Sequence, residues 1–201
     1  MAQDSSLAKK IWGNDRQAKT LFVEEKYDFR SSWMKIGKND KERVEKLLEI
    51  LSKTTTGEKI VMKARMKALD FGSTLEELLS IGEGSLTDTT LIRRYLPTQG
   101  DKVSYESRSQ VIINRSHQLQ DAILDLAHEL THFSFRSPFN PYVVNFNLKD
   151  FIKSTVEGQG GEVDAYLVEC KVLKEAFSES TWRGSQCSRM VNDQGKLSRN
   201  M

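Results

Sequence analysis

Helical spacing of apolar residues dominates the chain between residues 39 and 82. A helix that starts at Asn39 or Asp40 and ends at residues 54–57 is predicted by a run at steps of three or four: Val44, Leu47, Leu48 and Leu51. A second helix is predicted over residues 58–70, with Ile60, Ala64 and Met66 facing inward. The Ser73–Glu76 stretch is typical of a capping box and predicts a short helix that closes near Gly82.

Alternation replaces helical spacing between residues 103 and 114. The apolar residues have odd numbers: Val103, Tyr105, Val111 and Ile113. The polar residues between them have even numbers: Glu106, Arg108 and Gln110. This pattern predicts one long strand or a hairpin. The polar stretch before it, residues 82–90, is interpreted as a loop in which Asp88 is a turn residue.

Two more amphipathic helices follow the strand. The first has Ser116 as its expected N-cap and an apolar stripe formed by Leu119, Ile123, Leu126, Leu130 and Phe133. A polar stripe beside it contains Asp121, Asp125, His128 and His132. The second helix follows the glycine-rich residues 158–161, and its expected apolar stripe is Val163, Tyr166, Cys170, Leu173 and Phe177.

The chain of 201 residues is long enough for one well-buried core, so a single domain is expected. Residues 39–178 are predicted to form this domain. The scattered aromatic residues of segment 1–38 are expected to pack onto it, although a segment in that place can also be an inhibitory pro-segment. The polar residues 179–201 are expected to be a loosely docked or disordered tail.

Composition adds little about partners. The chain has 30 basic and 28 acidic residues, a net charge of +2, which gives no strong attraction to nucleic acid or to an anionic membrane. Neither a signal peptide nor a run of 18 apolar residues is present, so a cytoplasmic location is expected, with non-classical export as the alternative. In a reducing compartment Cys170 and Cys187 are not expected to form a disulfide, and Cys170 is interpreted as a core residue.

Residues 128–132 read His-Glu-Leu-Thr-His, the HExxH pattern. Positions four apart share one face of a helix, so His128 and His132 can bind one metal ion between them. Zinc at a catalytic site takes three protein ligands and one water, and neutral histidine is a common ligand. Glu129 is therefore the candidate general base, since a carboxylate beside the ion can accept the proton of that water.

A third ligand is expected from the helix that follows the glycines. Glu162 lies in its first turn, 30 residues after His132, which leaves room for an antiparallel return. Glu157, Asp164 and Glu169 compete for the same role. A first-turn acid can also serve only to complement the helix dipole.

These residues resemble the gluzincin clan of metallopeptidases. His128, Glu129 and His132 match its HExxH helix, and Glu162-Val163-Asp164-Ala165 is similar to the Glu-x-x-Ala form of its second helix. The resemblance implies a zincin-like α+β domain, mostly helical, with a small sheet edging the active-site helix. It also implies Zn²⁺ as the cofactor, bound by His128, His132 and Glu162.

The expected function is therefore zinc-dependent hydrolysis of peptide bonds, with a peptide or protein as substrate and no nucleic acid or membrane partner. The alternative is a metal-binding regulatory or effector protein without peptidase activity. His117, Tyr142 and Tyr166 are each candidates for stabilising an oxyanion, and the sequence does not choose among them. The oligomeric state and the cleavage specificity also stay open.

Overall fold

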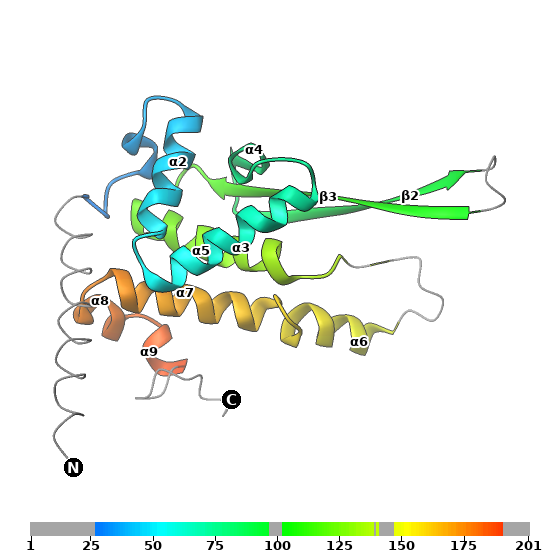
Figure 1. The fold of residues 1–201 in the computed structure, drawn as a ribbon. Coiled ribbons are helices and arrows are strands. Elements are labelled where there is room, and N and C mark those ends of the chain that lie inside the picture. The colour runs from blue at the N-terminus through cyan, green and yellow to red at the C-terminus, as the bar shows by residue number, and fades with distance from the viewer. Residues whose placement is uncertain (1–26, 97–101, 139, 141–146, 191–201) are drawn as a thin grey trace, which may run out of the picture.

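The helix α5 (Leu119–Phe135) runs through the middle of the protein, with a small sheet on one side and α7 (Glu162–Ala176) on the other (Figure 1). The computed structural model describes residues 27–96, 102–138, 140 and 147–190. Within these residues the fold is α+β and mostly helical, as the sequence predicts. Twelve of the seventeen α5 residues are buried, so this helix is the centre of the core.

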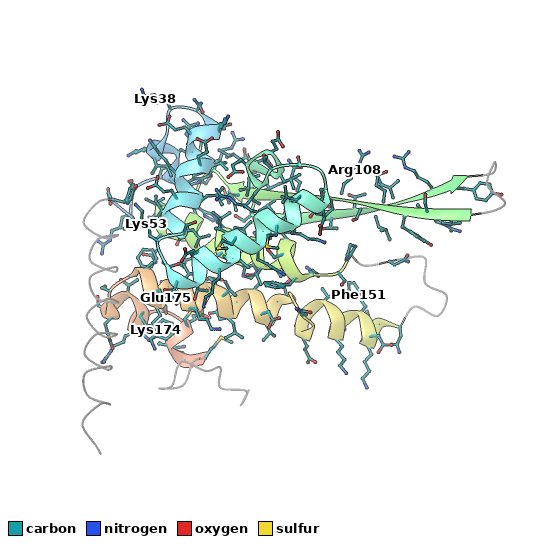
Figure 2. The ribbon with its side chains drawn as sticks, in the orientation of Figure 1. Lys38, Lys53, Arg108, Phe151, Lys174 and Glu175 are labelled. Carbon is teal, nitrogen blue, oxygen red and sulfur yellow. A yellow bond between two sulfur atoms is a disulfide. The ribbon has the colours of Figure 1, made fainter. Side chains whose placement is uncertain are left out.

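Two helices ahead of the sheet cover α5. The first, α2 (Asp40–Leu51), begins where Asn39 accepts a hydrogen bond from the backbone N–H of Glu42. The second, α3 (Thr55–Asp70), starts three residues earlier than predicted, because Thr54 caps it instead of ending α2. The carboxylate of Glu175 on α7 (labelled in Figure 2) accepts hydrogen bonds from the backbone and the hydroxyl of Thr56, which ties the start of α3 to α7.

The short helix α4 (Leu75–Leu78) forms as expected, but with a different capping box. Thr74 and Glu77 exchange the two hydrogen bonds, one residue later than the Ser73–Glu76 pair of the prediction. The helix also does not continue to Gly82. The chain becomes extended at once and forms the strand β1 (Leu79–Gly82).

The predicted loop at residues 82–90 is wrong from Leu86 onward. Residues Leu86–Leu96 form the strand β2, so Asp88 is a strand residue and not a turn residue. The alternating stretch is one long strand, β3 (Lys102–Asn114), as expected. The sheet order is β1-β3-β2, with β1 parallel and β2 antiparallel to β3. Figure 1 shows the β2–β3 ribbon extending well past the helices.

The start of α5 differs from the prediction. Gln118 occupies the N-cap position without a side-chain cap bond, and Ser116 donates its backbone N–H to the Asn114 side chain instead. Ahead of α5, residues 27–38 pack onto the core through Phe29 and Trp33, and Trp33 opens the 3₁₀ turn η1 (Trp33–Ile36). Residues 1–26 lie outside the described residues.

After α5 the described chain resumes with α6 (Leu148–Ile152), the π-helical turn η3 (Lys153–Glu157) and α7. The buried residues of α7 are Ala165, Cys170, Val172, Leu173 and Ala176. Val163 was expected on this face but is 41% exposed.

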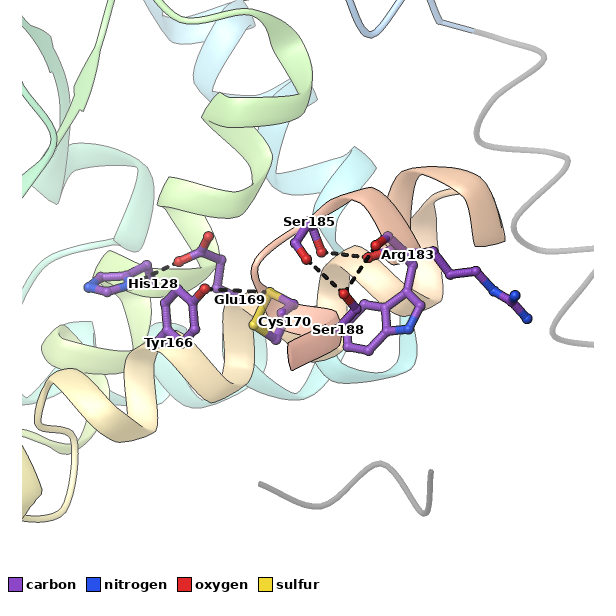
Figure 3. Close-up of a disulfide and its surroundings, with 9 residues drawn as sticks. His128, Tyr166, Glu169, Cys170, Arg183, Ser185 and Ser188 are labelled. Atoms are coloured by element: carbon purple, nitrogen blue, oxygen red, sulfur yellow. Dashed lines mark hydrogen bonds and ion pairs between the residues drawn. A yellow bond between two sulfur atoms is a disulfide. The ribbon is translucent and has the colours of Figure 1, made fainter. Parts of the chain in front are cut away.

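The prediction for the cysteines is also wrong, and the described part of the expected tail is folded. Residues 179–190 form two short helices, α8 (Glu179–Gly184) and α9 (Cys187–Met190), and Cys187 is buried. Cys187 forms a disulfide with Cys170 on α7, across a Cα–Cα distance of 5.4 Å (Figure 3). Cys170 is a core residue, but it is bonded. Residues 191–201 lie outside the described part of the chain.

None of the described helices combines the length and the apolar character that crossing a membrane requires.

Candidate metal centre

Two histidines on α5 and one glutamate at the start of α7 bring their side-chain tips together. The Nε2 atoms of His128 and His132 lie 3.1 Å apart, because residues four apart share a face of the helix. The Oε2 atom of Glu162 lies 3.4 Å from each of them. Among the described residues these three form a group able to hold a metal ion, with all ligand atoms within 4.8 Å of one another.

The other ring nitrogen of each histidine faces a hydrogen-bond acceptor. His132 Nδ1 lies 2.8 Å from the backbone carbonyl oxygen of Gly160, and His128 Nδ1 lies 3.3 Å from Glu169 Oε2 (Figure 3). A carbonyl or a carboxylate can only accept, so both rings carry their proton on Nδ1 when neutral. Both Nε2 atoms then present lone pairs. Two nitrogen lone pairs and a carboxylate oxygen therefore converge on one point with no donor between them.

Backbone geometry holds the segment that carries the Gly160 carbonyl. Gly160 has a φ of +69°, in the left-handed region that favours glycine. A Cβ atom there would lie 2.5 Å from the backbone nitrogen of Arg136, just after α5. The backbone N–H of Gly160 donates to Asp164 Oδ2 at 3.0 Å. Asp164 thus fixes the turn whose carbonyl orients His132.

Glu129 lies on the opposite flank of the histidines, against the sheet. The Oγ1 atom of Thr87, on β2, lies 2.8 Å from Glu129 Oε2 and 2.9 Å from the Glu129 backbone oxygen, so one hydroxyl proton is shared between two acceptors. Burial raises the pKa of Glu129 above its ordinary value, while Thr87 and the two histidines act in the opposite direction. The carboxylate is buried, close to the cluster, and held by one hydroxyl.

The charge around His128 is negative. Burial lowers the pKa of His128, but the hydrogen bond to Glu169 and the nearby carboxylates of Glu129 and Glu162 outweigh it and raise that pKa overall. Such surroundings favour a cation, whether a proton on the ring or a metal ion at Nε2.

The four acidic residues that were candidates for the third metal ligand differ clearly in what they contact. Glu162 reaches both histidines. Glu169 contacts the far nitrogen of His128, and Asp164 bonds the Gly160 backbone, so both lie one contact away from the converging atoms. Glu157 is exposed on η3, and no contact links it to the histidines.

The two described candidates for an oxyanion role, His117 and Tyr166, contact groups outside the cluster. His117 Nε2 lies 2.6 Å from Asp125 on α5 and 3.4 Å from the Ser85 hydroxyl. The hydroxyl of Tyr166 lies 4.0 Å from the Cys187 sulfur, so it is directed toward the disulfide (Figure 3). Tyr142 lies outside the described residues. The oxyanion role therefore stays a prediction without an assigned residue.

Three groups that contribute to the site were not predicted from the sequence. Thr87 sits in a stretch taken for a loop, and the Gly160 carbonyl is a backbone group that no residue pattern reveals. Arg136 places its guanidinium 3.7 Å from Glu162 Oε1, the oxygen that does not face the histidines. One signal was present in the sequence: Arg136 follows His132 by four residues, although in the structure it lies just past the end of α5.

Comparison of the chain with protein-family models, with curated proteins and with solved structures finds no match.

Proposed function

We propose that the protein is a zinc metallopeptidase of gluzincin type. His128, His132 and Glu162 hold the ion, and Glu129 is the general base. The observation that carries the proposal is the convergence of three acceptor atoms, two Nε2 and one carboxylate oxygen, at 3.1–3.4 Å from one another. Without a cation, three acceptors at these distances repel one another.

The donor set and its spacing fit zinc. Two imidazoles and a carboxylate are a ligand set found at catalytic zinc sites. With zinc–ligand distances of about 2.0–2.1 Å, the ligand atoms of a tetrahedral site lie about 3.3–3.4 Å apart. The outer partners support the same assignment, since Glu169 and the Gly160 carbonyl fix each ring with Nε2 directed at the ion.

The chemistry then divides between the ion and the chain. Zinc supplies Lewis acidity, which lowers the pKa of a water molecule and polarises a carbonyl group. Glu129 takes the proton and later delivers it to the leaving amine. Thr87 holds one oxygen of the Glu129 carboxylate in place through its hydroxyl.

The substrate is a peptide that lies along β2. At the level of the site the strand β3 is paired on both sides and has no free edge for a peptide. β2 is an edge strand, and its Thr87 contacts Glu129. An extended peptide can add to such an edge through main-chain hydrogen bonds.

The test is metal content followed by turnover. Purified protein is expected to contain about one zinc per chain, and titration calorimetry of Glu162→Ala is expected to show a loss of zinc affinity larger than the ~10–100-fold typical of an outer partner. Glu157→Ala is the matched control, since this exposed glutamate lies five residues away and should bind zinc like the wild type.

A quenched-fluorescence peptide library measures the activity. Cleavage should stop on chelation and return with added zinc. A protein that binds zinc but cleaves no peptide would be a metal-binding regulatory protein, and a protein without zinc after expression in zinc-supplemented medium would remove the metal site altogether.

A further inference from the structure

The helix α3 has apolar side chains on two opposite faces. One face is buried against α5 and α7 and contains Gly57, Ile60, Val61, Ala64 and Ala68. On the other face Met62, Met66 and Leu69 are 60%, 63% and 71% exposed. Their steps of four and three place them in one line along the helix, about 10 Å long. A helix with two apolar faces usually packs on both.

One flank of this exposed line is basic. Lys59, Lys63 and Lys67 follow one another at intervals of four residues and so form a row beside the methionines. Lys67 pairs with Asp70, and the Lys63 ammonium lies 5.9 Å from the centre of the Phe135 ring. Within the described part of the chain Lys59 has no ion-pair partner. The opposite flank is mixed, with Glu58 and with Arg65 paired to Glu76.

We propose that this face of α3, defined by Met62, Met66, Leu69 and the three lysines, binds an amphipathic helix of a partner protein. The partner helix carries an apolar stripe and a row of carboxylates on one flank. Apolar anchors at helical steps are the usual pattern of helix-on-helix recognition, and methionine adapts its shape to different partners. The lysine row provides the electrostatic complement that selects an acidic helix.

Charge argues against three other occupants. A second copy in antiparallel contact would place lysine row against lysine row. An anionic lipid surface would meet Glu58 and Glu76 on the mixed flank, and the apolar line is only three residues long. Residues 1–26 of this chain carry four acidic and five basic residues, so they offer no acidic excess.

The surface is separate from the candidate metal centre. It lies on the side of α3 turned away from α5, which carries both histidines. The proposal therefore does not rest on the peptidase assignment. If the metal site is disproved, the proposed binding face of α3 is unaffected. If the binding face is disproved, the metal site is unaffected.

The test uses two synthetic helical peptides and fluorescence anisotropy. Both peptides carry leucines at helical spacing, and one flank is all glutamate in the first and all lysine in the second. The acidic peptide is expected to bind at least about tenfold more tightly, since one tenfold step needs only ~1.4 kcal/mol across several charge pairs. The preference should weaken at high salt and should reverse in Lys59→Glu/Lys63→Glu.

Substitution of the apolar line completes the test. Met62→Ser/Met66→Ser should weaken binding of the acidic peptide by about tenfold or more, because two methionines lose their apolar contact. Leu148→Ser, at an equally exposed leucine on α6, is the matched control and should bind like the wild type. Melting temperatures of all variants should equal that of the wild type, since the substituted side chains are exposed.

Four outcomes would overturn the proposal. They are equal binding of both peptides, no binding of either, binding only to vesicles that contain phosphatidylserine, and a dimer seen by light scattering that Met62→Ser/Met66→Ser abolishes.

Discussion

The two sides of α5 hold their functional groups in different ways. On the α7 side, each histidine has a partner behind it, and Glu162 closes the cluster from the first turn of a 15-residue helix. On the sheet side, Glu129 is held by a single hydroxyl of one residue, Thr87, near the start of β2. Several residues therefore position the groups on the α7 side, whereas one residue positions Glu129 on the β2 side.

This difference matches what the proposed function requires of each side. A metal site needs fixed ligands, because their geometry and protonation set the affinity. A general base must exchange a proton during each turnover, so its carboxylate needs one oxygen held and the other available. Substitutions on the two sides should therefore separate: those on the α7 side should alter zinc affinity, and those on the β2 side should alter turnover with zinc retained.

The largest effect is expected for Glu129→Gln. The amide keeps the shape and can still accept a hydrogen bond from Thr87, but it cannot take a proton. Turnover should fall by roughly two to four orders of magnitude, while zinc affinity stays within a few-fold of the wild type. Parallel kinetics and calorimetry check this, and loss of zinc in the variant would show that Glu129 acts as a ligand.

Next in size is removal of the Cys170–Cys187 disulfide, which fixes α9 to the helix that carries Glu162. The bond closes a loop of 17 residues, and a loop of about 15 corresponds to ~3 kcal/mol of stabilisation in the chain-entropy model. Cys170→Ala/Cys187→Ala should lower the free energy of unfolding by about that amount in urea titrations.

The reduced wild type is the control for this pair and should unfold at the same urea concentration as the double variant. A midpoint that does not move with reductant would mean that the two cysteines are not bonded in the purified protein.

A smaller loss of metal affinity is expected for Glu169→Gln. The amide can present its oxygen to His128 Nδ1 but carries no charge, so the ring becomes a weaker base at Nε2. Outer partners of this kind are typically worth about 10–100-fold in metal affinity or activity. Glu175→Gln, six residues further along α7 and bonded to Thr56, is the matched control and should leave zinc affinity unchanged.

How far the sequence predicts the structure also differs between the two sides. The α5 and α7 helices follow from apolar stripes at helical spacing, which is a local property of the chain. Glu169 and Asp164 could be named from the sequence as competitors for the third ligand, but nothing in the sequence indicated the role of the Gly160 carbonyl. Its role depends on a positive φ that brings the turn against the end of α5.

The β2 side was largely missed for a physical reason. In β2 the apolar residues fall at positions 86, 91, 92, 95 and 96, without alternation, because most of this strand is exposed and no buried face imposes a period of two. Thr87 and Glu129 are 42 residues apart, so their contact has no local signature. The disulfide was not predicted because an expected cytoplasmic location implies reduced cysteines. The fold nevertheless brings Cys170 and Cys187 together.

The smallest expected effect is that of Thr87→Val, and it tests the comparison most directly. Valine keeps the branched shape on the strand but removes the hydroxyl that holds Glu129. A hydrogen bond to a charged group contributes about 1.5–3 kcal/mol, and part of this is recovered when water replaces Thr87, so turnover should fall by roughly tenfold. Zinc affinity should not change, since no ligand or outer partner is touched. Thr87→Ser restores the hydroxyl and should return most of the activity. A fall in zinc affinity in Thr87→Val with recovery in Thr87→Ser would show that the β2 side also positions the metal ligands, and the division between the two sides of α5 would then be wrong.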